Sequence, residues 1–297
     1  MFRTFQEIED YVLSKNIVKK IALCGAHDEP ALSAVVNACK KGIVSCVLIG
    51  DQPQVEEILK ELGEDPSKYT IIHEPDEAES AKKAVAMVKN GEADIPMKGL
   101  MQTASYMRAI LNKETGILPP GHVLSETTVF EYPDQNRFVM ISDCGINIEP
   151  DTKAKVEIAK NAVALAKAFG IEEPKVAVLS ALEKVNPKIR STVEADELAK
   201  MEWEGCVVEG PYALDNAINE EAAHHKGIEG KVAGKADVLV VPDLCAGNIL
   251  HKSINFFAHL RLAGAVCGTE HPVILTSRSD SPDTKYCSIL TAVLQSL

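Results

Sequence analysis

Short apolar runs alternate with longer segments of helical periodicity along nearly the whole chain. The apolar residues of segment 53–62 recur with the i, i+3, i+4, i+7 spacing of an amphipathic helix. Segment 44–49 is largely apolar over a length typical of a buried strand, and a glycine and an aspartate follow it. The predicted strands are 18–23, 44–49, 69–72, 93–97, 137–142, 175–180, 206–209, 236–242 and 273–275. The predicted helices are 5–15, 30–39, 53–62, 77–89, 104–112, 152–169, 192–204, 214–225, 249–262 and a last one that follows Lys285.

This alternation predicts the fold class. Long helices between successive strands favour right-handed crossovers in parallel sheets that are covered on both faces. Segment 118–136 interrupts the pattern with three prolines and a glycine, and we interpret it as a partly stranded crossover or hinge. We therefore predict an α/β protein with two domains. Each domain is expected to be an open, mostly parallel sheet with helices on both faces, with the active-site cleft between the two.

The predicted domain bounds follow from the position of this hinge. A chain of 297 residues is long enough for two medium α/β domains. We expect the last strand–helix unit to return to the first domain, which then comprises residues 1–136 and 270–297. The second domain is expected to comprise residues 137–269.

Polar turns follow the predicted strands, and two of these turns carry cationic residues. Lys98 and Gly99 follow one strand, and Ser277, Arg278, Asp280 and Asp283 follow the last one. Ligands of open α/β sheets bind beyond the carboxyl ends of the strands, and arginine can donate two parallel hydrogen bonds to phosphate. The alternative is a surface turn whose charges are solvated. The turns alone do not decide between these two interpretations.

Overall charge narrows the class of partner. The formal net charge is −12, and no run of lysine and arginine is longer than two residues. This argues against nucleic acid or an anionic membrane surface as the main partner, although local cations can still bind small anions. No apolar run approaches the ~20 residues that span a bilayer. We expect a cytoplasmic protein.

The eight cysteines indicate a reducing compartment. They contain no C-x-x-C pair, and most of them lie in apolar runs, as buried free thiols do. Any one of them could be a nucleophile, but none has a histidine nearby in the sequence. Their positions are 24, 39, 46, 144, 206, 245, 267 and 287.

Motifs for common cofactors and nucleophiles are missing. No G-x-G-x-x-G follows a predicted strand, and neither a P-loop nor a G-x-S-x-G elbow occurs. The strand-end carboxylates Asp143, Glu183 and Asp243 leave a Mg²⁺ site open as an alternative. The remaining polar set, which includes Lys98, Ser277, Arg278 and Asn248 with several carboxylates, suits a reaction between anionic substrates. Such a reaction needs orientation, an oxyanion donor and a proton-transfer group.

Five motifs, spread in order over essentially the whole chain, resemble one known family. They are KGLMQTASYMRAIL (98–111), SALEKVNPK (180–188), EGPYALDN (209–216), PDLCAGN (242–248) and LTSRSDS (275–281). The family is that of the phosphate acetyl/butyryltransferases, and its phosphate butyryltransferase branch is the most similar. The resemblance implies two α/β domains, a homodimer, and reversible acyl transfer between coenzyme A and phosphate. Both are substrates, and no tightly bound cofactor and no metal is implied.

The resemblance also implies roles for individual residues. Ser277 matches the orienting serine of the family, and Arg278 matches the arginine that holds phosphate and the developing oxyanion. Lys98, Gly99, Thr103 and Asn248 are expected to contact phosphate or coenzyme A.

One position departs from the family pattern. The catalytic aspartate of the acetyltransferase branch lies six residues after this arginine, where the present chain has Thr284. Asp283 is the preferred candidate for the base that removes the thiol proton, and Asp280 is the second. Acetyl specificity, a Mg²⁺- and NAD-dependent decarboxylating dehydrogenase of similar architecture, and a non-catalytic coenzyme A-binding module remain alternatives.

Overall fold

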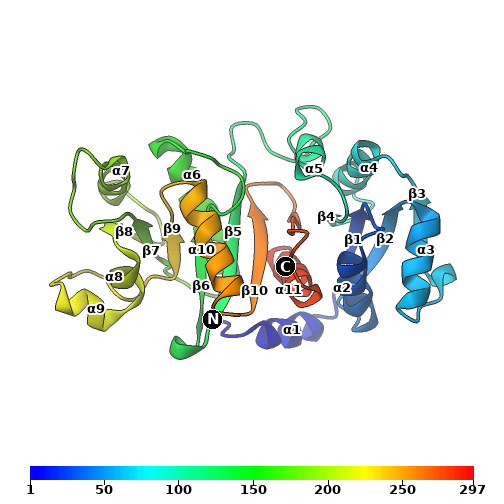
Figure 1. Cartoon of the computed structure of the whole chain (residues 1–297), viewed down its shortest axis with the longest axis horizontal. Helices are drawn as coiled ribbons and strands as arrows, with labels where there is room; N and C mark the ends of the chain where they lie inside the picture. The colour runs from blue at the N-terminus through cyan, green and yellow to red at the C-terminus, as the bar shows by residue number, and fades with distance from the viewer. The chain divides into compact units, whose positions relative to one another are not determined.

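The computed structural model describes residues 1–297 and separates into two compact units. We call Phe5–His122 with Arg261–Leu297 the terminal unit, and Met1–Thr4 with Val123–Leu260 the central unit. None of the helices combines the length and the apolar character that crossing a bilayer requires. Each unit has its own sheet, and the elements are labelled in Figure 1.

The terminal unit is built on a parallel sheet with the strand order β3-β2-β1-β4. Its strands are β1 (Lys19–Cys24), β2 (Val44–Gly50), β3 (Thr70–His73), β4 (Ile95–Lys98) and, outside this sheet, β10 (Leu262–Cys267). Its helices are α1 (Phe5–Ser14), α2 (Glu29–Lys40), α3 (Gln52–Glu61), the 3₁₀ turn Pro66–Lys68, α4 (Glu77–Lys89), α5 (Thr103–Ile110) and α11 (Pro282–Gln295). The alternation predicted from the sequence is therefore confirmed in this unit.

The last part of the chain completes the terminal unit. Ile274 forms a parallel bridge with Met97 of β4, and Val273 forms an antiparallel bridge with Val266 of β10. These are isolated bridges, so the predicted strand 273–275 is reduced to a bridged segment. Helix α11 follows and packs against α2, α1 and β10 (Figure 1). The segment therefore lies beside the carboxyl end of β4.

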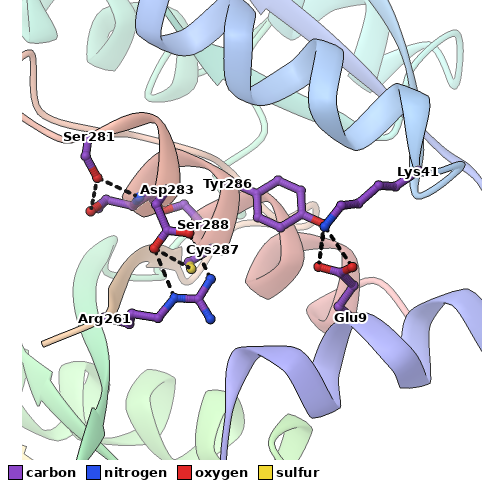
Figure 2. A network of polar contacts seen from close by, with 9 residues as sticks. Glu9, Lys41, Arg261, Ser281, Asp283, Tyr286, Cys287 and Ser288 are labelled. Carbon is purple, nitrogen blue, oxygen red and sulfur yellow. Dashed lines mark hydrogen bonds and ion pairs between the residues drawn. The ribbon is translucent and has the colours of Figure 1, made fainter.

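A buried polar contact fixes α11 in the terminal unit. The carboxylate of Glu9 on α1 accepts a hydrogen bond of 2.7 Å from the Tyr286 hydroxyl and bonds of 2.8 and 3.0 Å from Lys41 Nζ. Burial raises the pKa of Glu9, but the bonds from Lys41 and Tyr286 outweigh this effect, and the net shift is downward. Figure 2 shows this contact and the first turn of α11. It joins α1 and the end of α2 to the last helix.

The central unit contains a mostly parallel sheet with the strand order β5-β6-β9-β7-β8. Only β5, which forms a hairpin with β6, runs antiparallel to its neighbour. The strands are β5 (Ser125–Tyr132), β6 (Arg137–Ser142), β7 (Lys175–Leu179), β8 (Val207–Tyr212) and β9 (Val238–Val240). The helices are the 3₁₀ turn Pro133–Gln135, α6 (Thr152–Ala168), α7 (Arg190–Ala199), α8 (Leu214–Ile218), α9 (Glu220–His225) and α10 (Leu244–Phe256). The predicted fold class, an α/β protein with two mostly parallel sheets, is confirmed.

The unit boundaries lie elsewhere than the sequence suggested. They fall after Thr4, His122 and Leu260, whereas the sequence pattern placed them after residues 136 and 269. The hairpin explains the first difference, because β5 pairs with β6 over its whole length and so belongs with the central sheet. The second difference arises because β10 packs against α11 and is part of the terminal unit.

Candidate functional site

Three chain segments meet where the strands of the terminal unit end. The backbone N–H of Gly99 donates to the Cys24 carbonyl at 2.8 Å, and the N–H of Leu100 donates to the Gly25 carbonyl at 2.9 Å. The N–H of Lys98 donates to the Ile274 carbonyl at 3.0 Å. The residues that follow β1, β4 and the bridged segment are therefore held at one edge of the unit.

Two glycines make this close approach possible. Gly25 has φ +61°, and a Cβ added to it would lie 2.6 Å from the Leu100 carbonyl oxygen. A Cβ on Gly99 would lie 2.3 Å from the Gly25 carbonyl oxygen. Only a residue without a side chain fits such a backbone contact. Gly99, which the sequence suggested as a ligand contact, is thus required by packing in this structure.

Lys98 is a buried cation at this edge. Lys98 is the last residue of β4. It is 3% exposed, and its side chain donates to the Gly99 carbonyl at 3.3 Å. Burial lowers the pKa of Lys98, and the neighbouring charge of Lys285 lowers it further. Asp28 acts in the opposite direction, and Arg278 adds to the lowering. Lys98 therefore has two cationic neighbours and one anionic neighbour, all of them in the terminal unit.

Lys285 is a second buried cation, and the sequence analysis missed it. It lies on α11, is 1% exposed, and donates to the Ser277 carbonyl at 2.8 Å and to Thr276 Oγ1 at 3.1 Å. Burial lowers its pKa, while Asp28 and Asp280 raise it in part. Two of its three ammonium protons hold the turn that contains Ser277, so Lys285 joins the last helix to this turn.

The turn 277–280 is held from inside by Asp280. This carboxylate is 7% exposed and accepts a hydrogen bond of 2.7 Å from the Ser277 N–H, while its other oxygen is buried without a partner. The Ser277 hydroxyl lies 3.0 Å from the Ser279 hydroxyl, and the Arg278 side chain is exposed. Asp280 and Lys285 together fix the backbone of Ser277, and Arg278 projects from the fixed turn.

Asp283 has a different environment. It lies in the first turn of α11, as the sequence suggested, and both of its oxygens bind Arg261, at 2.8 and 3.0 Å (Figure 2). It also lines a cavity of about 420 Å³ with residues of α2 and with Tyr286. Asp283, the preferred candidate base, is therefore paired with Arg261 in this structure.

Asp28 is a carboxylate that the sequence analysis did not single out. It follows β1 and occupies the N-cap position of α2, but its side chain makes no capping hydrogen bond. It is half-buried, and its charge acts on both Lys98 and Lys285. The edge therefore combines three cations (Lys98, Lys285 and Arg278) with two carboxylates (Asp28 and Asp280). Such a set suits a small dianion such as phosphate.

Two other predicted site residues lie at separate positions. Thr103 is exposed and begins α5, close in sequence to Lys98. Asn248 belongs to the central unit, where it is exposed on α10 and its Nδ2 donates to the Cys144 carbonyl at 3.3 Å. The Asn248 amide therefore donates its hydrogen bond to a backbone group of its own unit.

The candidate Mg²⁺ ligands are each engaged in the central unit. The Asp143 carboxylate accepts hydrogen bonds from the N–H groups of residues 145, 146 and 147, and Asp243 caps α10. Glu183 binds Asn216 and Lys226. No group of three potential metal ligands occurs. These carboxylates hold loops and a helix end in place.

The cysteines offer no activated thiolate at the strand ends. None of the eight forms a disulfide, and Cys24, which ends β1 beneath Gly99, is fully buried. Burial raises the pKa of the Cys24 thiol to about 12, so the nucleophilic thiolate is scarce near neutral pH.

Comparison with known proteins identifies the family. The model of the family described as "phosphate acetyl/butaryl transferase" matches residues 73–293, which include Lys98, the turn 277–280 and Lys285. The chain belongs to this family. Asp28 lies outside the matched residues.

Named relatives of this transferase family cover nearly the full chain. A phosphate butyryltransferase from Clostridium acetobutylicum is 44% identical over 99% of this chain and 98% of its own length. A phosphate acetyltransferase from Thermotoga maritima is 42% identical over 93% of this chain and 95% of its own length. The crystal structure of a branched-chain phosphotransacylase from Enterococcus faecalis V583 matches with a TM-score of 0.83 and 33% identity, over 94% of this chain and 99% of that one. The transferase fold is thus shared over both units.

Proposed function

We propose that the protein is a phosphate acyltransferase that catalyses the reversible reaction of acyl-CoA and phosphate to acyl phosphate and coenzyme A. The observation that carries this proposal is the cation set Lys98, Lys285 and Arg278 at the strand ends of the terminal unit. Two of these cations are buried and pre-positioned, which suits an anion that must be oriented for attack. Family membership and the names of the relatives support the same reaction.

The residues divide into holding and positioning roles. Arg278 and the two lysines hold phosphate and stabilise the negative charge that develops on the acyl oxygen. Ser277 orients the phosphate or the acyl carbonyl, and Asp280 positions Ser277 through its backbone N–H. Thr103 and Asn248 are proposed contacts for phosphate or coenzyme A. Transfer is direct in a ternary complex, without an acyl-enzyme intermediate.

The acyl group is proposed to be butyryl. A butyryltransferase and an acetyltransferase are almost equally similar to this chain, at 44% and 42% identity, so similarity alone separates them little. Met97, Leu100 and Met101, at and just after the end of β4, are candidates for the wall of an acyl pocket; Met97 and Met101 are buried, and Leu100 is 40% exposed. Leu100 is therefore the side chain that can contact an acyl group. One methylene changes binding by about 1–3 kcal/mol, which sets the size of the expected preference.

The reaction is tested with the purified protein, a set of acyl-CoA substrates and a thiol reagent. We expect phosphate-dependent release of coenzyme A, with kcat/KM for butyryl-CoA about tenfold or more above that for acetyl-CoA. Isobutyryl-CoA and acetoacetyl-CoA complete the set, and omission of phosphate is the control. The absence of phosphate-dependent release with every C2–C6 acyl-CoA would refute the proposed reaction. A preference for acetyl-CoA would refute only the butyryl assignment.

We also propose that the protein is a homodimer that uses an apolar surface of α10. Ile249, Phe256 and Phe257 are exposed on or next to this helix, and Phe257 is 85% exposed. A neighbouring cavity of about 220 Å³ has an entirely apolar lining, which includes Leu250 and Ile254 of the same helix. Exposed apolar side chains gathered on one helix are typical of a protein interface.

The mass in solution tests this assembly. We expect light scattering to give twice the mass of the chain for the wild type and the mass of one chain for Phe257→Asp. Ile148→Asp is the matched control, because Ile148 is also exposed and apolar in the central unit but does not lie on α10. A monomeric wild type, or a Phe257→Asp variant that keeps the double mass, would contradict the proposal.

A further inference from the structure

Asp28 has an unusual position for a helix-capping aspartate. The other N-cap aspartates (Asp51, Asp65, Asp76, Asp151 and Asp243) each accept a hydrogen bond from a backbone N–H of the helix that they precede. Asp28 occupies the same position on α2 and makes no such bond. Its carboxylate is thus not used to satisfy the helix end, which is the usual reason for an aspartate at this position.

The position of Asp28 is fixed by the turn that joins β1 to α2. Gly25 is held by the N–H of Leu100, and the Asp28 carbonyl accepts the first helical bond of α2, from Leu32 at 2.8 Å. Lys98 of β4 and Lys285 of α11 are the charged neighbours of Asp28, and Arg278 lies beside Lys98. The adjacent His27 is directed to the backbone N–H of Asp51, at 3.4 Å. Asp28 therefore lies within electrostatic range of Lys98 and Lys285, four residues after Cys24, which pairs in register with Lys98 of β4.

The other two carboxylates near this edge are less available, because Asp280 is only 7% exposed and both oxygens of Asp283 are paired. Asp280 is buried and holds the Ser277 N–H, and Asp283 binds Arg261 with both oxygens. A group that exchanges a proton with a substrate needs a reachable oxygen within hydrogen-bond distance of the reacting atom. Asp28 is half-buried, and its charge acts on the two lysines that we assign to phosphate.

We propose that Asp28 is the catalytic carboxylate that exchanges a proton with the thiol of coenzyme A, an assignment that rests on the proposed function. With acyl phosphate as donor, Asp28 takes the S–H proton and the thiolate attacks the acyl carbon. The new C–S bond forms, the C–O bond to phosphate breaks, and its electron pair leaves on the phosphate oxygen, which takes the proton from Asp28 and departs as HPO4²⁻. In the opposite direction Asp28 takes the proton of HPO4²⁻ as the phosphate oxygen attacks acyl-CoA, the C–S bond breaks, and Asp28 gives this proton to the leaving thiolate. Protons and electrons balance in both directions without a further reactant.

A base at this sulfur matters because a free thiol has a pKa of about 8.5 and is mostly protonated near neutral pH. General acid–base catalysis by a positioned side chain contributes about 100-fold or more to the rate. Asp28→Asn is therefore expected to lower kcat by about 100-fold and to flatten the acid limb of the kcat–pH profile. The KM for phosphate should stay the same or fall, because the change removes a negative charge beside two lysines.

Three variants make the test specific. Asp51→Asn is the matched control, because Asp51 is also an N-cap residue that directly follows a neighbouring strand. Asp283→Asn tests the alternative base. Asp28→Glu retains the carboxylate, so it should keep the acid limb at a reduced kcat, and it decides the question if Asp28→Asn does not fold.

The outcomes separate this inference from the proposed function. A wild-type protein without phosphate-dependent release of coenzyme A would overturn both. An active wild type whose kcat and acid limb survive in Asp28→Asn would overturn the role of Asp28 alone. A large loss of kcat in Asp283→Asn, with little loss in Asp28→Asn, would transfer the role to Asp283. A lower melting temperature in Asp28→Asn with unchanged kcat and KM would show a structural role and would also overturn the proposal.

Discussion

Replacement of Arg278 by alanine is expected to lower kcat/KM for phosphate by about 150-fold or more. Two charge-assisted hydrogen bonds to phosphate, each contributing about 1.5–3 kcal/mol, are lost with the guanidinium. The thermal stability should change little, because the Arg278 side chain is exposed. Steady-state kinetics at varied phosphate, together with a melting curve, measure both effects.

Two further variants show which property of Arg278 matters. Arg278→Lys keeps the charge but loses the planar fork, and it should recover only part of the activity. Lys60→Ala removes an exposed cation from α3 of the same unit and is the matched control, with unchanged kinetics expected. Unchanged kinetics in Arg278→Ala would remove Arg278 from the site.

Lys285→Met is expected to lower kcat/KM for phosphate by about tenfold or more. The change removes a buried cation and the two hydrogen bonds that hold Thr276 and Ser277, while methionine fills a similar volume. Addition of inorganic phosphate should raise the melting temperature of the wild type and not that of the variant, because a ligand stabilises only the fold that binds it. An equal phosphate-induced rise in both proteins would contradict this role for Lys285.

The pH dependence of stability gives an independent measure of the buried charge. Burial lowers the pKa of Lys285 below its unfolded value of 10.5, so the unfolded chain holds more protons in the window just below 10.5. The contribution of Lys285 to the free energy of unfolding therefore rises as pH rises through its lowered pKa. The contribution is measured as the free energy of unfolding of the wild type minus that of Lys285→Met. This difference should increase as pH rises over this window. Chemical denaturation at several pH values measures it.

The sequence predicted the fold class correctly, and the roles of the site residues stay predictions. Hydrophobic periodicity found the alternation of strands and helices because the period of each element is a local property of the sequence. The motif around Arg278 was recognised by its resemblance to the family, which is also a property of the local sequence. The structure then showed that Lys98 and the turn 277–280 belong to one unit, through the backbone bond from Lys98 to Ile274.

Lys285 and Asp28 could not be assigned from the sequence, for two different reasons. A lysine in the first turns of a helix is usually solvated, although Lys285 lies four residues before the buried Ile289, on the same face. This spacing was the available signal. An aspartate before a helix is usually a cap, so Asp28 matched an ordinary pattern, and only its missing capping bond sets it apart. Packing against distant segments decides both cases, and local periodicity does not contain that information.

The terminal unit is built from two segments that are far apart in the sequence, and this has a consequence for the nascent chain. The ribosome makes Asp28 and Lys98 before residues 123–260 of the central unit, and it makes residues 261–297 only after them. Until Ile274 emerges, the outer edge of β4 lacks the backbone partner that it has in the finished fold. An open strand edge is exposed to wrong pairing, and chaperones protect such edges during translation. With the roles proposed above, the full cation set for phosphate forms only once Lys285 is in place. Activity is therefore expected only after the two discontinuous segments of the terminal unit have joined.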